Sequence, residues 1–183
     1  TIIARAFPGG QTALHLGANI QTADFASTQR AGTSAIIGAL DAARDGRTVL
    51  VAAADMRQTR AGSFYEMWYG DGAAALLFGG ENVIAEFAGS HSVSYDFVGH
   101  YRAAGQRFDY TWEERWVRDQ GYSKIIPEAI RGLLDKLDMR IDQVDRLIYP
   151  CFFDREHAGI ARSLGADPAQ VADRHGRIDH RAD

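Results

Sequence analysis

The sequence has a single cysteine and only 4 prolines in 183 residues. One cysteine cannot form an intrachain disulfide framework, and without a Cys-x-x-Cys pair it offers no zinc-ribbon signature, so we expect a reducing, cytoplasmic setting. No apolar run reaches membrane-spanning length, and residues 1–7 lack the form of a signal peptide. Neither charge sign dominates, because 20 basic and 24 acidic residues give a formal net charge of -4. We therefore expect neither nucleic acid nor an anionic membrane as a partner.

What the sequence does have is an ordinary globular composition, with 46% hydrophobic and 24% charged residues. A chain of this length can bury a sizeable core. It has no initiating methionine, and residues 173–183 form a polar tail. We expect it to be a piece of a longer protein.

The chain is organised around the turn Gly70-Asp71-Gly72, which leads into the alanine-rich apolar residues 73–78. A polar, glycine-punctuated turn before such a run is typical of a tight loop that enters a fully buried strand. The small side chains would let another group pack closely against the turn. Residues 48–54 form a second continuous apolar run, which favours the central strand of a sheet covered on both faces.

Elsewhere the hydrophobic pattern alternates between strand and helix. Residues 1–19 have no clean period and predict an irregular segment. We expect short strands at residues 22–27, 83–87 and 143–150, and helices at residues 33–44, 122–137 and 156–164. Gly46 and Gly165 follow two of these helices, where glycine favours helix termination, and Pro168 favours the start of another short helix. The alternation indicates an α/β layered fold.

Two features interrupt this regular alternation. Pro127 lies inside the helix expected at residues 122–137, and it predicts either a first-turn start or a kink there. Residues 90–120 are rich in aromatic side chains but have no sustained period. An excursion of that length predicts a functional lid or a small subdomain.

Several short stretches, taken in order, resemble the thiolase superfamily, most closely its 3-hydroxy-3-methylglutaryl-CoA synthase branch, with β-ketoacyl-ACP synthase III as a neighbour. The resemblance covers residues 18–173. The stretches that carry it are Ala31-Gly32-Thr33, Gly70-Asp71-Gly72-Ala73, Asp96-Phe97, Gly105-Gln106-Arg107-Phe108 and Leu147-Ile148-Tyr149-Pro150.

The resemblance implies an α/β fold in which two similar halves form a layered αβαβα sandwich, of which this chain is a part. Residues 1–80 would be the end of the first half, and residues 81–183 the start of the second half, including the excursion at residues 90–120. It also implies a homo- or hetero-oligomer with another thiolase-like subunit, with residues 48–54 near the subunit contact. An OB-fold or zinc-ribbon companion is a further expectation on the same grounds.

In such enzymes a cysteine takes the acyl group as a thioester, while a histidine and an asparagine position the second substrate. These residues do not carry over to this sequence. One alignment places Gln29 at the nucleophile's position, and another places Ser27 there. The element that holds the histidine and asparagine corresponds to Pro150-Cys151-Phe152-Phe153.

Cys151 is therefore the third catalytic candidate, beside Ser27 and Gln29. It could be a displaced nucleophile with His157 as its base, or a buried thiol that behaves as a small hydrophobe. The substrate-binding candidates are His100, Arg107, Phe108 and Tyr149. We expect no metal site, because the spacing of His175 and His180 matches no metal-binding motif and there are no partner cysteines.

Three hypotheses remain open from the sequence. The first is an acyltransferase or condensing enzyme that acts on acyl-CoA or acyl-carrier protein, with the CoA thioester as substrate and no other cofactor. The second is a non-catalytic subunit whose partner chain holds the active cysteine. The third is retro-aldol cleavage of a hydroxyacyl-CoA, in which Tyr65, Tyr69 or Tyr149 would act as acid or base.

Overall fold

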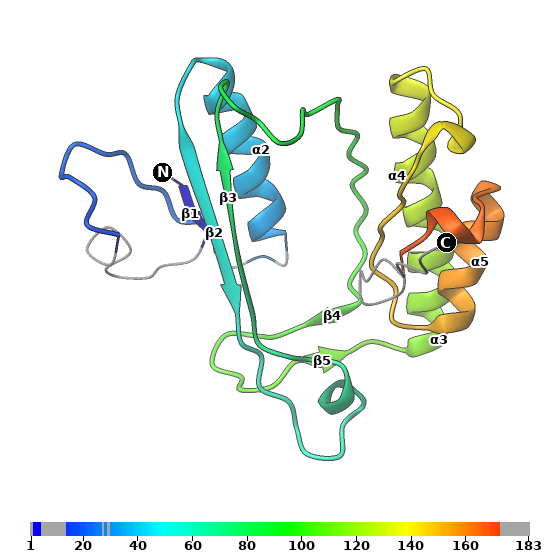
Figure 1. The fold of residues 1–183 in the computed structure, drawn as a ribbon. Coiled ribbons are helices and arrows are strands. Elements are labelled where there is room, and N and C mark those ends of the chain that lie inside the picture. The colour runs from blue at the N-terminus through cyan, green and yellow to red at the C-terminus, as the bar shows by residue number, and fades with distance from the viewer. Residues whose placement is uncertain (1, 5–13, 27, 29, 173–183) are drawn as a thin grey trace. The chain divides into compact units, whose positions relative to one another are not determined.

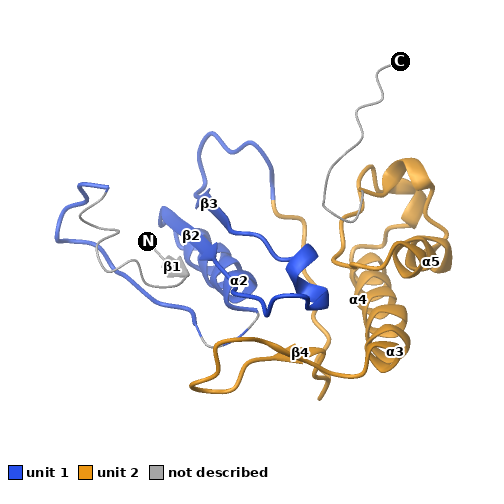
Figure 2. Ribbon diagram, turned by 90° about the horizontal axis from the view of Figure 1, so that it is seen from below, with its two compact units in different colours: residues 1–86 blue, residues 87–183 orange. Residues whose placement is uncertain are grey.

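The computed structural model describes residues 2–4, 14–26, 28 and 30–172 (Figure 1). The chain divides into two compact units, Thr1–Glu86 and Phe87–Asp183 (Figure 2). The sequence-based division after residue 80 stays a prediction, because a compact unit is not the same as half of a thiolase-like fold. No helix among the described residues is both long and apolar enough to cross a membrane.

Unit 1 contains a sheet with the order β1-β2-β3, built from β1 (Ile2–Ala4), β2 (Val49–Asp55) and β3 (Gly72–Phe78). β1 runs parallel to β2, and β3 runs antiparallel to it with Val49 opposite Phe78. Helix α2 (Ala31–Arg44) lies on one face of the sheet (Figure 1). Its small residues pack closely against the start of β2, in a cluster formed by Ala35, Ala39, Ala42, Val49 and Val51.

The periodic signals for these elements are confirmed. The expected helix at residues 33–44 is α2, and Gly46 follows it with a φ of +77°, which glycine adopts without strain. The apolar run at residues 48–54 is β2, which is the central strand of the sheet among the described residues.

Other expectations for unit 1 are wrong. The irregular segment at residues 1–19 includes strand β1, and the described part of the strand expected at residues 22–27, residues 22–26, contains only an isolated bridge at Asp24. β3 is a strand but not a buried one, since its first six residues are exposed. Residues 83–87 form no strand, and the Ile84 side chain is fully exposed. Apolar, β-branched residues favour a strand only where a neighbouring strand supplies hydrogen bonds, and none does so here within the described chain.

Unit 2 is built on a continuous helical run made of α3 (Glu114–Trp116), the π turn η2 (Val117–Tyr122) and α4 (Ser123–Lys136). This confirms the helix expected at residues 122–137. Pro127 is buried inside α4, so the predicted helix start at Pro127 is wrong. The alternative, a kink at Pro127, stays a prediction; the π turn η2 ends at Tyr122, before this proline, which has no N–H to donate within the helix.

The extended residues 87–99 run alongside this helix in the opposite direction (Figure 1). Gly89 lies against Leu137 at one end, the Tyr95 hydroxyl donates to Glu128 at 2.5 Å, and Phe97 lies against Gly121 at the other end. Eight extended residues span about 26 Å and sixteen helical residues about 24 Å, so the two segments match in length. The first part of the expected excursion is therefore packed on the helix.

The middle of the excursion forms a short antiparallel hairpin, β4 (His100–Tyr101) and β5 (Tyr110–Thr111), and its last residues, 114–120, belong to α3 and η2. The chain ends in η3 (Ile141–Gln143), α5 (Asp154–Leu164) and η4 (Pro168–Gln170). Gly165 closes α5 with a φ of +72°, and Pro168 opens η4, as predicted.

The strand expected at residues 143–150 is wrong. Of these residues, only Leu147 forms a β-bridge, which pairs it in parallel with Val171. Pro150 has no N–H to donate to a ladder, and Ile148 is 64% exposed. The core of unit 2 is formed by Leu147, Tyr149, Cys151 and Ile160, and the first two of these residues come from this segment.

Candidate functional site

Gly70 and Asp71 lead directly into β3, whose first residue is Gly72, and a turn at these three residues stays a prediction. The close packing expected around its small residues is absent, because a Cβ added at Gly70 or Gly72 would meet no atom within 4 Å. Asp71 is exposed. The turn therefore makes no site of its own within the described part of unit 1.

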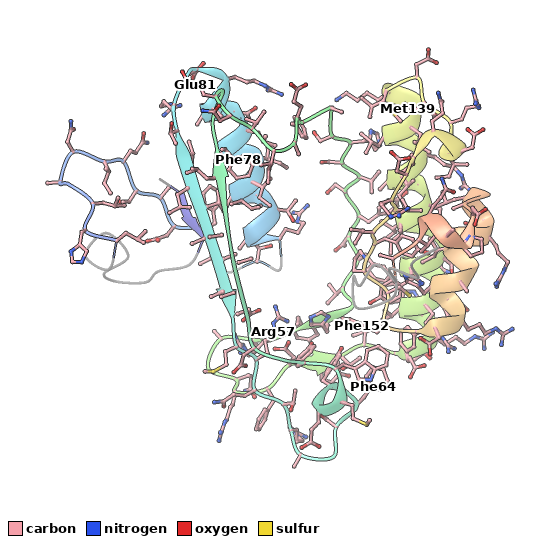
Figure 3. All side chains as sticks on the ribbon, in the orientation of Figure 1. Arg57, Phe64, Phe78, Glu81, Met139 and Phe152 are labelled. Atoms are coloured by element: carbon pink, nitrogen blue, oxygen red, sulfur yellow. The ribbon has the colours of Figure 1, made fainter. Side chains whose placement is uncertain are left out.

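The segment between β2 and this turn holds an aromatic cluster around η1 (Phe64–Met67). The rings of Tyr65 and Tyr69 stack at 4.6 Å. Arg57, which is labelled in Figure 3, lies 5.7 Å from the centroid of the Tyr69 ring. The Arg57 guanidinium also contacts the Asp55 carboxylate at 2.8 Å. Two of the tyrosines named for acid–base chemistry are thus held together by ring packing.

Two of the three catalytic candidates, Ser27 and Gln29, lie outside the described residues. Thr28, between them, is exposed, and its hydroxyl accepts from the Arg30 N–H at 3.3 Å. The choice between Ser27 and Gln29 as the residue at the nucleophile's position stays a prediction.

Cys151, the third candidate, lies in the core of unit 2 just before α5. Its side chain is 1% exposed, and its thiol donates to the Phe153 carbonyl at 3.6 Å. Burial raises the pKa of the Cys151 thiol, and the nearby Glu156 and Asp154 carboxylates raise it further. The thiolate is the nucleophilic form, so this setting suppresses covalent chemistry near neutral pH.

Tyr149 and His157 form a ring pair beside Cys151. Their centroids lie 4.5 Å apart in a stacked arrangement, and the Tyr149 hydroxyl donates to the His157 carbonyl at 2.8 Å. Burial, with a smaller contribution from Cys151, raises the pKa of Tyr149 to about 12. Tyr149 therefore keeps its proton near neutral pH and serves as a hydrogen-bond donor to the backbone.

His100 belongs to β4, on the hairpin. Its Nε2 lies 4.0 Å from a carboxylate oxygen of Asp109, whose side chain is only 6% exposed, and Arg102 contacts the other oxygen at 3.9 Å. Asp109 was missed from the sequence, where it is one acidic residue among many. The hairpin register brings it beside His100, and only a prediction of that register could have found it.

Four arginines lie in the excursion at residues 90–120 and carry the charge that a contact with a phosphate needs. Three of them contact carboxylates: Arg102 with Asp109 at 3.9 Å, Arg115 with Asp119 at 3.6 Å, and Arg118 with Glu114 at 3.3 Å. The fourth, Arg107, lies 5.3 Å from the centroid of the Phe108 ring. Arg107 and Phe108 are the hairpin pair that best combines a cation with an aromatic face.

The candidates therefore fall into two groups within unit 2. Tyr149 and Cys151 belong to its core, with His157 stacked on Tyr149, whereas His100, Arg107 and Phe108 belong to the hairpin region. Among the described residues, no set of three histidine, cysteine or acidic side chains is placed to hold a metal ion.

Cys151 should react slowly with alkylating reagents. We expect iodoacetamide at pH 8 to label the native protein at least about tenfold more slowly than the urea-unfolded protein, because burial both blocks the thiol and disfavours its thiolate. Intact-mass spectrometry over time measures both rates. Equal rates would contradict the buried placement of Cys151.

Tyr149 should make unit 2 sensitive to alkali. Its pKa is near 10 in an unfolded chain and about 12 here, so its contribution to stability is complete below pH 10 and is lost as the pH rises through 12. We expect Tyr149→Phe to flatten this decline and to cost about 1 kcal/mol at pH 7 through the lost hydrogen bond. Urea unfolding at several pH values measures both, with the exposed Tyr110→Phe as control. An unchanged decline in Tyr149→Phe would refute the assignment.

No protein-family model matches the chain. Solved structures identify its fold. The MvaS protein solved in complex with 3-hydroxy-3-methylglutaryl coenzyme A has a TM-score of 0.72 at 20% identity, and the match covers 97% of this chain and 48% of that chain. For 3-oxoacyl-(acyl carrier protein) synthase III (FabH) from Pseudomonas aeruginosa PAO1, the TM-score is 0.71 at 17% identity, covering 97% and 61%. The protein therefore has the mixed α/β thiolase-like fold, as the sequence predicted.

Comparison with curated sequences gives a more specific similarity. The hydroxymethylglutaryl-CoA synthase of Methanopyrus kandleri is 29% identical over 155 residues, which cover 84% of this chain and 44% of that protein. The chain is thus distantly similar in sequence to hydroxymethylglutaryl-CoA synthase and shares the thiolase-like fold. It spans about half the length of the relatives that it matches.

Proposed function

We propose that this chain is a protein of cytoplasmic acyl-CoA metabolism that does not form the cysteine thioester with its own residues. The observation that carries the proposal is the setting of Cys151, the one cysteine of the sequence, which is 1% exposed and has a raised pKa. A thiol that stays protonated and covered makes a poor acyl acceptor. The absence of a family-like histidine and asparagine at Pro150-Cys151-Phe152-Phe153 supports the same conclusion.

The ligand we propose is a CoA thioester or an acyl group on acyl-carrier protein. One similar structure is described in complex with 3-hydroxy-3-methylglutaryl coenzyme A, and another is named as a 3-oxoacyl-(acyl carrier protein) synthase III. In this chain, Arg107 and Phe108 offer a cation and an aromatic face, the two features that bind a phosphate and an adenine ring. His100 on the same hairpin is the third proposed contact.

Calorimetric titration with acetyl-CoA, acetoacetyl-CoA and free CoA tests this assignment. We expect binding of at least one thioester, weakened about tenfold or more by Arg107→Ala, because a charge-assisted contact to phosphate is lost. Arg140→Ala is the matched control, since Arg140 is an exposed arginine that contacts Asp142 at 3.0 Å. If neither the CoA compounds nor acyl-carrier protein binds, the proposal fails.

The burial of Cys151 equally supports the second reading, a non-catalytic subunit that completes an oligomer with another thiolase-like chain. Such a subunit would show no turnover alone. For the retro-aldol hypothesis, Tyr149 is a poor candidate acid, because its hydroxyl donates to a backbone carbonyl and its pKa is raised to about 12. Tyr65 and Tyr69 stay as its candidates. Assaying cleavage of a hydroxyacyl-CoA with Tyr65→Phe and Tyr69→Phe separates these readings.

A further inference from the structure

A cavity of about 430 Å³ lies in unit 1, beside the second half of α2 and the first residue of β2. Sites for small molecules have volumes of about 300–1,000 Å³, so the cavity is large enough to hold one. The described residues that line it are Asn19, Ile20, Gln21, Ala23, Gly38, Ala42, Arg47, Thr48 and Val49. None of these residues is a candidate for acyl transfer or for CoA binding.

Part of the lining is apolar and built of small residues. Gly38 and Ala42 are four residues apart, so they lie on one face of α2, and Val49 is the first residue of β2. Ala42 is 9% exposed and Val49 is 3% exposed, because both belong to the core cluster of unit 1. Core packing holds this part of the lining in place, and its small side chains leave room for a short hydrocarbon group.

The polar part of the lining carries one charge. Among the described lining residues, only Arg47 is charged, and it is exposed. The guanidinium Nη1 donates to the Gln21 side-chain oxygen at 3.4 Å, and Nη2 lies 3.6 Å from a carboxylate oxygen of Asp45. A guanidinium has five N–H donors, so these two long contacts leave donors for a ligand. The Asp45 side chain is 75% exposed, and solvent therefore weakens its hold on Arg47.

We propose that this cavity binds a small carboxylate with a short hydrocarbon chain. The carboxylate oxygens meet the Arg47 guanidinium, whose planar fork of N–H donors matches two oxygens at once. The hydrocarbon chain lies on Gly38, Ala42 and Val49, where it leaves water. Exposed amide and hydroxyl groups of Asn19 and Thr48 complete the polar side. This inference is independent of the acyl-CoA function, because it uses other residues.

Butyrate is the probe that tests the proposal. We titrate it at constant ionic strength into the ¹⁵N-labelled 183-residue protein and follow the amide signals by NMR. We expect saturable shifts at the lining residues, with a dissociation constant of about 1–10 mM, because so small a ligand makes few contacts. Butyramide has the same shape without the charge, and inorganic phosphate has charge without the chain. Each should bind at least about tenfold more weakly than butyrate.

Three variants assign the binding to Arg47. Arg47→Ala should weaken butyrate binding at least about tenfold, because the charge-assisted contact is lost. Asp45→Asn should tighten it about twofold or more, because Asp45 competes for the guanidinium and repels the ligand. Arg44→Ala is the matched control and should leave binding unchanged. Arg44 is also an exposed arginine, with a contact to Asp41 at 2.8 Å, but it is not among the described lining residues.

The substituted side chains are all exposed, so each variant should keep the fold, and its amide spectrum verifies this. Butyrate that causes no saturable shift at the lining residues would overturn the proposal. Equal losses in Arg47→Ala and Arg44→Ala, or weaker binding in Asp45→Asn, would do so too. Butyramide or phosphate binding as tightly as butyrate would contradict the proposed ligand class.

Discussion

Ile160→Ala should lower the free energy of unfolding of unit 2 by about 3–4 kcal/mol. Ile160 is 2% exposed and lies in the cluster with Leu147, Tyr149 and Cys151. Removing its buried methyl groups loses their transfer free energy and leaves a cavity that the surrounding helix and chain can fill only in part. Urea unfolding followed by tryptophan fluorescence measures the loss, because Trp112 and Trp116 both belong to unit 2.

Ile148→Ala is the matched control from the same core segment. Ile148 is 64% exposed, so its truncation should change stability by less than about 0.5 kcal/mol. Trp68 lies in unit 1, and its replacement by phenylalanine isolates the signal from unit 2. A cost below about 1 kcal/mol for Ile160→Ala would show that this cluster does not hold unit 2 together.

Gly121→Ala should destabilise unit 2 by about 1–3 kcal/mol. A Cβ added at Gly121 would lie 2.6 Å from the Cζ atom of Phe97, which is closer than real contacts allow. The Phe97 ring has little freedom to move away, because it stacks on Trp116 with a centroid distance of 4.3 Å. The same urea titration detects the loss, and hydrogen exchange should show residues 87–99 released from the helix.

Two variants separate this clash from a general effect of alanine. With Phe97→Ala already in place, Gly121→Ala should no longer cost stability, because nothing remains for the new methyl group to strike. Gly159→Ala, within α5, should stabilise by up to about 1 kcal/mol, because its Cβ would meet only Arg162 at 3.9 Å. Equal losses from both glycine substitutions would contradict the packing of Phe97 on the helix.

The sequence was most informative where local period and packing agree. α2, α4 and α5 each follow a helical repeat, and Gly46 and Gly165 mark two of their ends. The sequence was least informative for strands. Residues 83–87 and 143–150 have strand-like composition, but a strand exists only through its neighbour, and the described chain supplies none for the first and a single bridge for the second. β3 is the opposite case, because it is a strand as predicted, but its apolar sequence predicted burial and its first six residues are exposed.

For the candidate site, the sequence named residues but did not show their surroundings. The resemblance singled out Tyr149 and Cys151, which the fold brings into one cluster. Burial raises the pKa values of both residues; Cys151 adds to the shift of Tyr149, and the Glu156 and Asp154 carboxylates of α5 add to the shift of Cys151. The partnership of His100 with Asp109 depends on hairpin register, which residue types alone do not fix.

The central claim is that this thiolase-like chain does not carry an acyl group on its own residues. Intact-mass spectrometry after incubation with acetyl-CoA, acetoacetyl-CoA and longer acyl-CoAs, with peptide mapping of any adduct, tests it most directly. The account predicts an unmodified mass in every case. A stoichiometric acyl adduct on Cys151 or Ser27 would contradict it and restore covalent condensing chemistry to this chain.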